Sequence, residues 1–96
     1  MDIAVLEKEI DDVSIAFYQN REQEGLEKVG ALLPKLKIVT DALLEVRDED
    51  EQQILFFISM MYQNFNRAYE QKDMLGMADC LQEYAAPIAA LYRLKY

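Results

Sequence analysis

The chain has 96 residues, 52% of them hydrophobic, and its eighteen acidic and ten basic residues give a net charge of −8. This length fits one domain, residues 1–96, and the charge disfavours nucleic acid and anionic membranes as partners because both are themselves negative. A single cysteine, no apolar run of the roughly 18 residues that cross a bilayer, and an opening segment unlike a secretory signal predict a cytoplasmic protein.

Two amphipathic helices are predicted in the first half of the chain. The first carries apolar residues at helical spacing: Ile3, Leu6, Ile10, Val13 and Phe17. The second carries Leu26, Val29, Leu33, Leu36, Thr40 and Leu43, and its stripe continues past Pro34, which predicts a kink rather than an end. Asn20 is the candidate N-cap of the second helix, with Gln23 three residues later. Because residues 20–24 contain no glycine or proline, one bent helix is the alternative.

A third helix is predicted to begin near the acidic run at residues 48–51. Asp48 and Glu51 have the spacing of a capping box, and acids are favoured at the positive end of a helix dipole. A calcium site is the other interpretation of clustered carboxylates. Capping is preferred, since the run lacks the glycine and the distal glutamate of a calcium-binding loop.

The third helix has apolar residues on two sides. Eight of the nine residues of Ile54–Tyr62 are apolar. At about 100° per residue, one stripe comprises Leu55, Ile58, Tyr62, Phe65 and Tyr69. Phe56 and Met60 point roughly the opposite way, with Phe57 on the flank. A small bundle covers one side, so the other needs an unusual internal placement or a partner.

The fourth helix is expected to start at the N-cap Asp73 and to continue past Pro87 with a kink. Its two overlapping stripes are Ala78, Leu81, Ala85, Ile88 and Tyr92, and Met77, Leu81, Tyr84, Ile88 and Leu91. Cys80 is interpreted as a buried structural thiol, because Asp79 and Glu83 beside it oppose a reactive thiolate.

Together these elements predict an all-α fold, an up-down four-helix bundle. It divides into hairpin one, about 2–46, and hairpin two, about 48–95. A shift of 52 residues places Ala16 on Ala68 and Gln19 on Gln71. Pro34 then lies within one residue of the position of Pro87. The pattern favours a duplicated hairpin, although two heptad-patterned helices also match by coincidence.

The candidate function is non-catalytic. With no histidine, the usual general base and metal ligand is missing, so we expect no catalytic residue, metal or cofactor. We expect a chaperone-like or adaptor-like module that binds a partner helix on the hydrophobic surface of helices three and four. Its anchors would be Phe56, Phe57 and Met60, with Gln53, Asn64 and Arg67 as polar rim. The alternatives are a purely structural homodimer and, less favoured, a carboxylate-based metal binder or enzyme.

Two phrases carry a resemblance to a protein family. They are FYQNREQEG at residues 17–25 and AYEQKDMLGMADCLQEYAAP at residues 68–87. They resemble segments of small acidic all-helical proteins of clostridia and related Firmicutes, which look like flagellar export chaperones in size, acidity and build. The chain departs from that pattern at Gly76 and at Ala85-Ala86. The resemblance implies a helical binding role, and it implies no catalytic residue.

Overall fold

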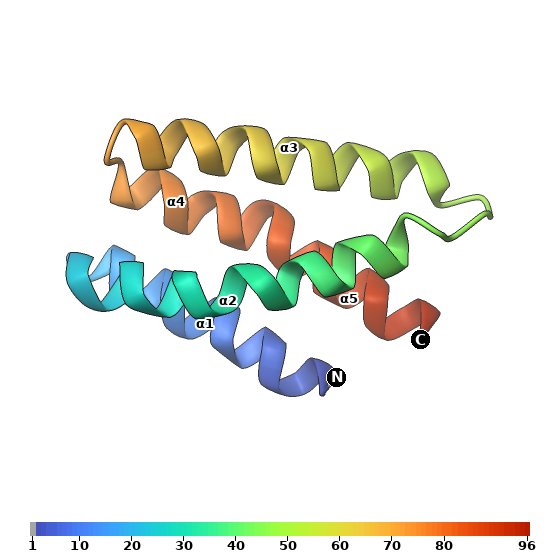
Figure 1. Ribbon diagram of the computed structural model, residues 1–96, viewed down its shortest axis with the longest axis horizontal. Helices are drawn as coiled ribbons and strands as arrows, with labels where there is room; N and C mark the ends of the chain where they lie inside the picture. The colour runs from blue at the N-terminus through green and yellow to red at the C-terminus, as the bar shows by residue number, and fades with distance from the viewer. Residues whose placement is uncertain (1) are drawn as a thin grey trace.

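The computed structural model describes residues 2–96 as a bundle of four helical rods, and this part of the chain contains no strand (Figure 1). The first three rods are α1 (Ile3–Tyr18), α2 (Glu22–Leu43) and α3 (Glu51–Glu70). The fourth runs through three consecutive segments, α4 (Met74–Cys80), the π-helical turn η1 (Leu81–Ala85) and α5 (Ala86–Lys95). The predicted all-α four-helix bundle is confirmed. None of the described helices has both the length and the apolar character needed to cross a membrane.

The two hairpins turn in the same way. Asn20 and Lys72 adopt left-handed backbone conformations, with φ of 62° and 54°. In each turn the next residue donates its N–H across the helix end, Arg21 to Ala16 O and Asp73 to Ala68 O, both at 2.8 Å. This is the Schellman motif, which satisfies the last carbonyls of a helix. The two turns are related by the 52-residue shift that superposes the hairpins, so that shift aligns local structure as well as apolar residues.

Two predicted caps differ from the structure. Asn20 does not cap α2: it ends α1, and Arg21 precedes α2 without a side-chain cap. Residues 19–21 thus separate two helices, and the single bent helix is excluded. Asp48 does not cap α3 either, because its carboxylate accepts the Asp50 N–H and the Lys95 ammonium, both at 2.8 Å. The cap at Asp73 is confirmed by its 2.9 Å bond from the Gly76 N–H.

Both interior prolines are accommodated without ending a rod. Pro34 lies inside α2, which continues to Leu43. Pro87 lies in the first turn of α5, which follows η1. At this junction the Ala86 N–H donates to the carbonyl of Leu81, five residues earlier, instead of to the carbonyl four residues earlier. A widened turn beside a proline is a common response to the missing N–H. The fourth rod therefore passes through its proline, as the apolar pattern predicted.

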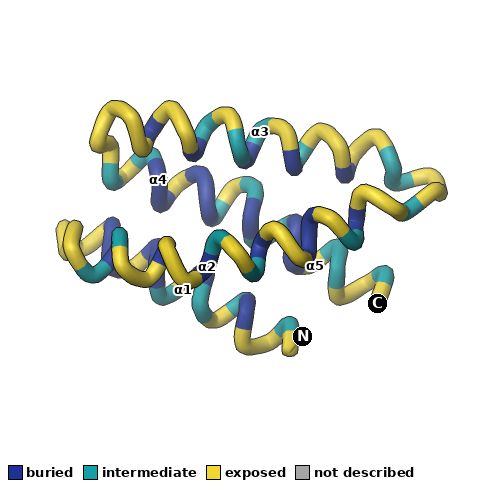
Figure 2. Tube along the Cα trace, in the orientation of Figure 1, coloured by how far each residue is buried: buried dark blue, intermediate teal, exposed yellow. Residues whose placement is uncertain are grey.

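The core runs along the inner sides of all four rods, and the outer sides are exposed (Figure 2). In α1 the predicted stripe is confirmed, with Leu6, Ile10, Val13 and Phe17 almost fully buried. In α3 the prediction is partly wrong. The buried residues are Ile54, Ile58, Met61, Phe65 and Ala68, whereas the predicted Leu55 and Tyr69 are 46% and 57% exposed. The apolar arc of α3 is too wide for periodicity to fix its rotation, and packing against the fourth rod decides it. There the Cys80 thiol donates to Met61 O at 3.2 Å.

One edge of the bundle is open. The rod α1 packs on α2 and α4, and α3 packs on α4 and η1, while α5 touches α1, α2 and α3. The consecutive helices α2 and α3 hardly touch each other and separate further with distance from the loop that joins them (Figure 1). This missing contact creates the largest concave surface described below.

Candidate functional site

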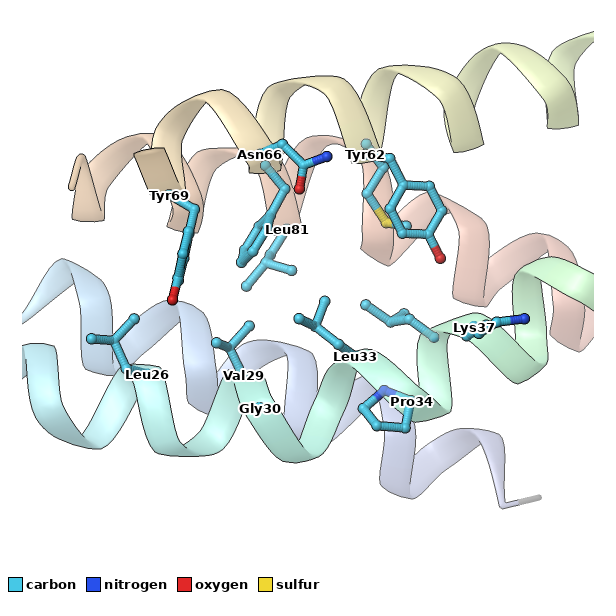
Figure 3. A pocket seen from close by; sticks show the side chains of 13 residues that line it. Leu26, Val29, Gly30, Leu33, Pro34, Lys37, Tyr62, Asn66, Tyr69 and Leu81 are labelled. Carbon is cyan, nitrogen blue, oxygen red and sulfur yellow. The ribbon is translucent and has the colours of Figure 1, made fainter. Parts of the chain in front are cut away.

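An apolar groove of about 700 Å³ fills the open edge between α2 and α3 (Figure 3). Its lining is formed by Leu26, Val29, Gly30, Leu33, Pro34, Leu36, Lys37, Met61, Tyr62, Phe65, Asn66, Tyr69 and Leu81. Among these residues Lys37 alone carries a charge. A concave, mostly apolar surface with a few polar groups is the usual form of a binding site.

Helical spacing on both walls builds the groove. On α2 the lining residues recur every three or four positions from Leu26 to Lys37, and on α3 they do so from Met61 to Tyr69. Leu81 of η1 is fully buried and lies behind both walls, so the fourth rod supplies the floor. Leu26 and Leu33 of α2 are half-buried, because they contact the core on one side and face the groove on the other. The sequence thus places a second apolar row on α2 that the bundle leaves uncovered.

The two ends of the groove differ. Toward the loop at residues 44–50 the walls are linked, with Thr40 Oγ1 and the Tyr62 hydroxyl 3.3 Å apart. Lys37 lies near this end and donates to Asp41 at 2.7 Å, a hydrogen bond that raises the pKa of its ammonium. At the other end the Tyr69 ring points from α3 toward Leu26 (Figure 3) and is 57% exposed. The groove therefore narrows to a polar bridge at one end and is open at the other.

The aromatic and methionine residues predicted to anchor a partner lie outside this groove. Phe56 is 56% exposed on the outer side of α3. Phe57 is half-buried, and its ring contacts Phe56 edge-on at 5.9 Å and Tyr84 of η1 at 6.2 Å between centroids. Met60 is half-buried on the same flank. The structure thus groups these residues along the outer side of α3 and its border with the fourth rod.

The predicted polar rim residues Asn64 and Arg67 lie together in a shallow hollow of about 300 Å³ between α3 and the fourth rod. Asn64 donates to Met60 O at 2.8 Å, so its amide is already engaged within α3. The hollow also contains Asp73, Asp79 and Glu83. It is largely polar, unlike the groove, and offers little apolar surface for a helix.

Sequence reasoning missed the groove because it depends on a distance between two helices. Tyr62, Phe65 and Tyr69 were assigned to one stripe with an internal role, and the open edge beside that stripe has no sequence signature. One signal was present in α2. Gly30 and Pro34, two poor helix formers, lie one turn apart in the middle of a strongly patterned helix. Such local conflicts are common where function overrides stability.

Few side chains among the described residues are suited to making or breaking covalent bonds. Within residues 2–96 no three histidine, cysteine or acidic side chains come together as metal ligands. Burial raises the pKa of the Cys80 thiol to about 11, which keeps it protonated and unreactive at neutral pH. A hydrogen bond to Asp79 raises the pKa of Tyr18. The chemistry that this arrangement supports best is apolar burial in the groove.

Comparison of the chain with protein-family models, with curated proteins and with solved structures found no match. No residue role is therefore transferred to it from another protein, and the groove is interpreted from its own geometry.

Proposed function

We propose that this chain is a non-catalytic, chaperone-like or adaptor-like module that binds a helix of a partner protein in the groove between α2 and α3. The single observation that supports this function is the open edge of the bundle. Two helices that follow each other in the chain leave an apolar channel between them, where a further helix would complete the packing. Burial of an amphipathic helix in such a channel is a common mode of protein recognition.

The dimensions of the groove suit a short helix. Its lining spans twelve residues on α2, from Leu26 to Lys37, which at 1.5 Å per residue is roughly three turns. A partner would present apolar side chains at positions i, i+3 or i+4, and i+7 to Leu26, Leu33 and Phe65. Each such side chain that is fully buried contributes about 1.5–3 kcal/mol. Two or three of these contribute about 3–9 kcal/mol before the entropy of association is subtracted, so the groove suits weak and reversible binding.

This site differs from the surface expected from the sequence. Phe56 and Met60 project from another side of α3, and they form a ridge rather than a channel. A ridge can pack against a flat partner, whereas a groove between two helices offers contacts on both sides of an inserted rod. None of the residues that line the groove belongs to the surface predicted from the sequence, so the two surfaces can be tested separately.

A helical-peptide display selection against the wild-type protein provides the test. Selected peptides are measured by fluorescence anisotropy against wild type, Leu33→Glu in the groove and Phe56→Glu on the ridge. Leu33 is half-buried and Phe56 is exposed, so both carboxylates can reach water and the fold should persist, which circular dichroism checks. We expect Leu33→Glu to weaken binding at least about tenfold, since a charge would face the apolar stripe of the peptide.

Other results contradict the proposal. If Phe56→Glu abolishes binding and Leu33→Glu does not, the partner surface is the ridge predicted from the sequence. If selection yields no helical peptide that binds the folded protein, the groove does not bind helices. Tyr69→Ala serves as a second groove variant, because its exposed ring can be removed without opening the core.

A further inference from the structure

We infer that the helix bound in the α2–α3 groove is cationic, with lysine or arginine side chains on both flanks of its apolar stripe. This inference rests on the proposed function and adds the chemistry of the partner. Three features of the groove support it: the backbone at Gly30 without a side chain, the carbonyl one turn before Pro34 that lacks its helical donor, and the charges that border the two walls.

Gly30 marks where a partner's backbone can approach. A Cβ added at Gly25 would lie 2.5 Å from the Phe17 ring, and one added at Gly76 would lie 2.5 Å from the Asp73 carboxylate. Both glycines are therefore required by packing inside the chain. A Cβ added at Gly30 meets no atom within 4 Å. Glycine in a helix interior is less stable than alanine, and the fold itself gives no reason for it here. A partner helix bound in the groove would explain the glycine, because its backbone can pass close to α2 at Gly30.

Pro34 adds a hydrogen-bond acceptor to the same wall. In an uninterrupted helix the N–H of residue 34 donates to the carbonyl of residue 30, and proline has no N–H. The carbonyl oxygen of Gly30 thus loses its helical donor beside the exposed pyrrolidine ring. Lysine and arginine carry several donors on long flexible stems and are suited to reach such an oxygen from a neighbouring helix.

The charges beside the groove are mostly negative. Lys37 is matched by Asp41. Glu27 lies one turn before Gly30, and Glu70 lies one turn after Asn66, so each borders a wall of the groove. Both are exposed, and within residues 2–96 neither is paired with a basic side chain, although Lys72 follows in the turn beyond α3. Complementary flanks on a partner are therefore basic.

The net negative charge of the protein argues against a second copy of this chain as the partner bound in the groove. Each copy carries a net charge of −8, so the approach of two copies brings like charges together. A basic helix gains from the same field, which attracts it before contact and weakens as salt is added. The groove and the charge thus favour a basic partner over self-association.

Two designed peptides of about 20 residues test the inference, with the same leucine and alanine stripe and either lysine or glutamate at every flanking position. Binding to the full chain is measured by fluorescence anisotropy at low and high salt. We expect the lysine peptide to bind at least tenfold more tightly than the glutamate peptide at low salt, with the difference shrinking as salt rises. Gly30→Leu, which fills the groove with a good helix former, should weaken the lysine peptide at least tenfold.

A matched pair of variants locates the charge effect. Glu27→Gln/Glu70→Gln removes two charges beside the groove, and Glu45→Gln/Glu49→Gln removes two exposed charges in the α2–α3 loop. The first variant should reduce the preference for lysine several-fold more than the second. If both reduce it equally, the attraction is a property of the whole negative surface and the inference is wrong.

The remaining outcomes separate this inference from the proposed function. If both peptides bind equally and Gly30→Leu weakens both, the groove binds helices without charge preference and only the inference fails. If neither peptide binds, or if binding of the lysine peptide is unchanged in Gly30→Leu, the proposed function fails with it. If sedimentation shows a dimer that Gly30→Leu disrupts, the occupant is a second copy and the inference is overturned.

Discussion

Gly25 and Gly30 lie five residues apart in α2 and have opposite surroundings. Gly25 is buried against the Phe17 ring, which is itself almost fully buried. Gly30 is exposed in the wall of the groove with open space where its side chain would be. One glycine therefore serves internal packing, whereas the other leaves a surface uncovered.

Alanine substitution should affect these two positions in opposite directions. Gly30→Ala should raise the free energy of unfolding by about 0.5–1 kcal/mol, because alanine restricts the unfolded chain and favours the helix. Gly25→Ala should lower it by about 1–3 kcal/mol, because the added methyl overlaps the Phe17 ring. Urea unfolding followed by circular dichroism measures both. A stabilising Gly25→Ala would show that Phe17 has freedom that its burial does not indicate.

Lys95 illustrates how a single residue joins distant elements. Its ammonium donates to Asp48 at 2.8 Å and lies 2.7 Å from an Asp50 carboxylate oxygen, so the end of α5 is attached to the α2–α3 loop. The Tyr96 hydroxyl adds a 3.0 Å bond to Ala42 O. The acidic run that suggested a helix cap or a calcium site therefore contributes two of its carboxylates to this internal clasp.

The clasp should open in acid. The hydrogen bond from Lys95 lowers the pKa of Asp48 below its usual value of 3.8. A carboxyl with a lowered pKa in the folded state contributes stability above its usual pKa and loses it as pH falls through the lowered value. We expect the amides of residues 46–50 to become mobile only once the pH falls below 3.8, as measured by NMR relaxation.

Lys95→Met should produce that mobility at neutral pH, and Lys8→Met, which breaks the exposed Lys8–Asp12 pair within α1, should not. Loop mobility that is equal in wild type and Lys95→Met at neutral pH would contradict the clasp. Within residues 2–96 the side chain of Lys8 pairs only with Asp12 of its own helix, so the control removes the same charge without changing a contact between elements.

At the scale of elements, the sequence determines which residues lie on each helix but not always which way the helix faces. The stripe of α1 is narrow, and the structure confirms it. The apolar arc of α3 is broad, so Leu55 and Tyr69 were expected inside, whereas Ile54 and Met61 are buried instead. Rotation is set by tertiary packing, which a single-helix pattern does not contain.

The conformations of the turns were also only partly predictable from the sequence. Asp73 is recognised as a cap by residue type alone, and the structure confirms it. Lys72 in a left-handed conformation has no such signal, since glycine is the usual residue there. Asn20 is also tolerated in that conformation, and its side chain suggested a cap for the helix that follows rather than an end for α1. The candidate groove was not predicted because it depends on the separation of α2 and α3.

At the scale of the molecule, the two hairpins share one core. The rod α1 packs against α4, η1 and α5, and side chains connect the halves at Arg93 with Glu7, Tyr18 with Asp79, and Gln82 with Ser14. Each half alone would expose the apolar residues that face the other. The repeated turn geometry thus describes two similar units that depend on each other for burial.

Separated hairpins should therefore not fold on their own. Peptides covering residues 1–46 and 47–96 are expected to show little helix individually and to regain most of it when mixed in equal amounts, because mixing restores the interface between α1 and the fourth rod. Circular dichroism of each fragment and of the mixture measures this. Cooperative unfolding of either fragment alone would identify an independent domain instead.

The position of the polar bridge between Thr40 and Tyr62 gives the groove a direction. It lies toward the same end of the bundle as both chain termini and the 44–50 loop, while the two hairpin turns occupy the opposite end (Figure 1). A partner helix longer than three helical turns would be obstructed by the polar bridge at one end of the groove. At the other end it would protrude past the two hairpin turns. The bulk of any large cargo would consequently lie beyond the hairpin turns, away from the start of α1 and the end of α5.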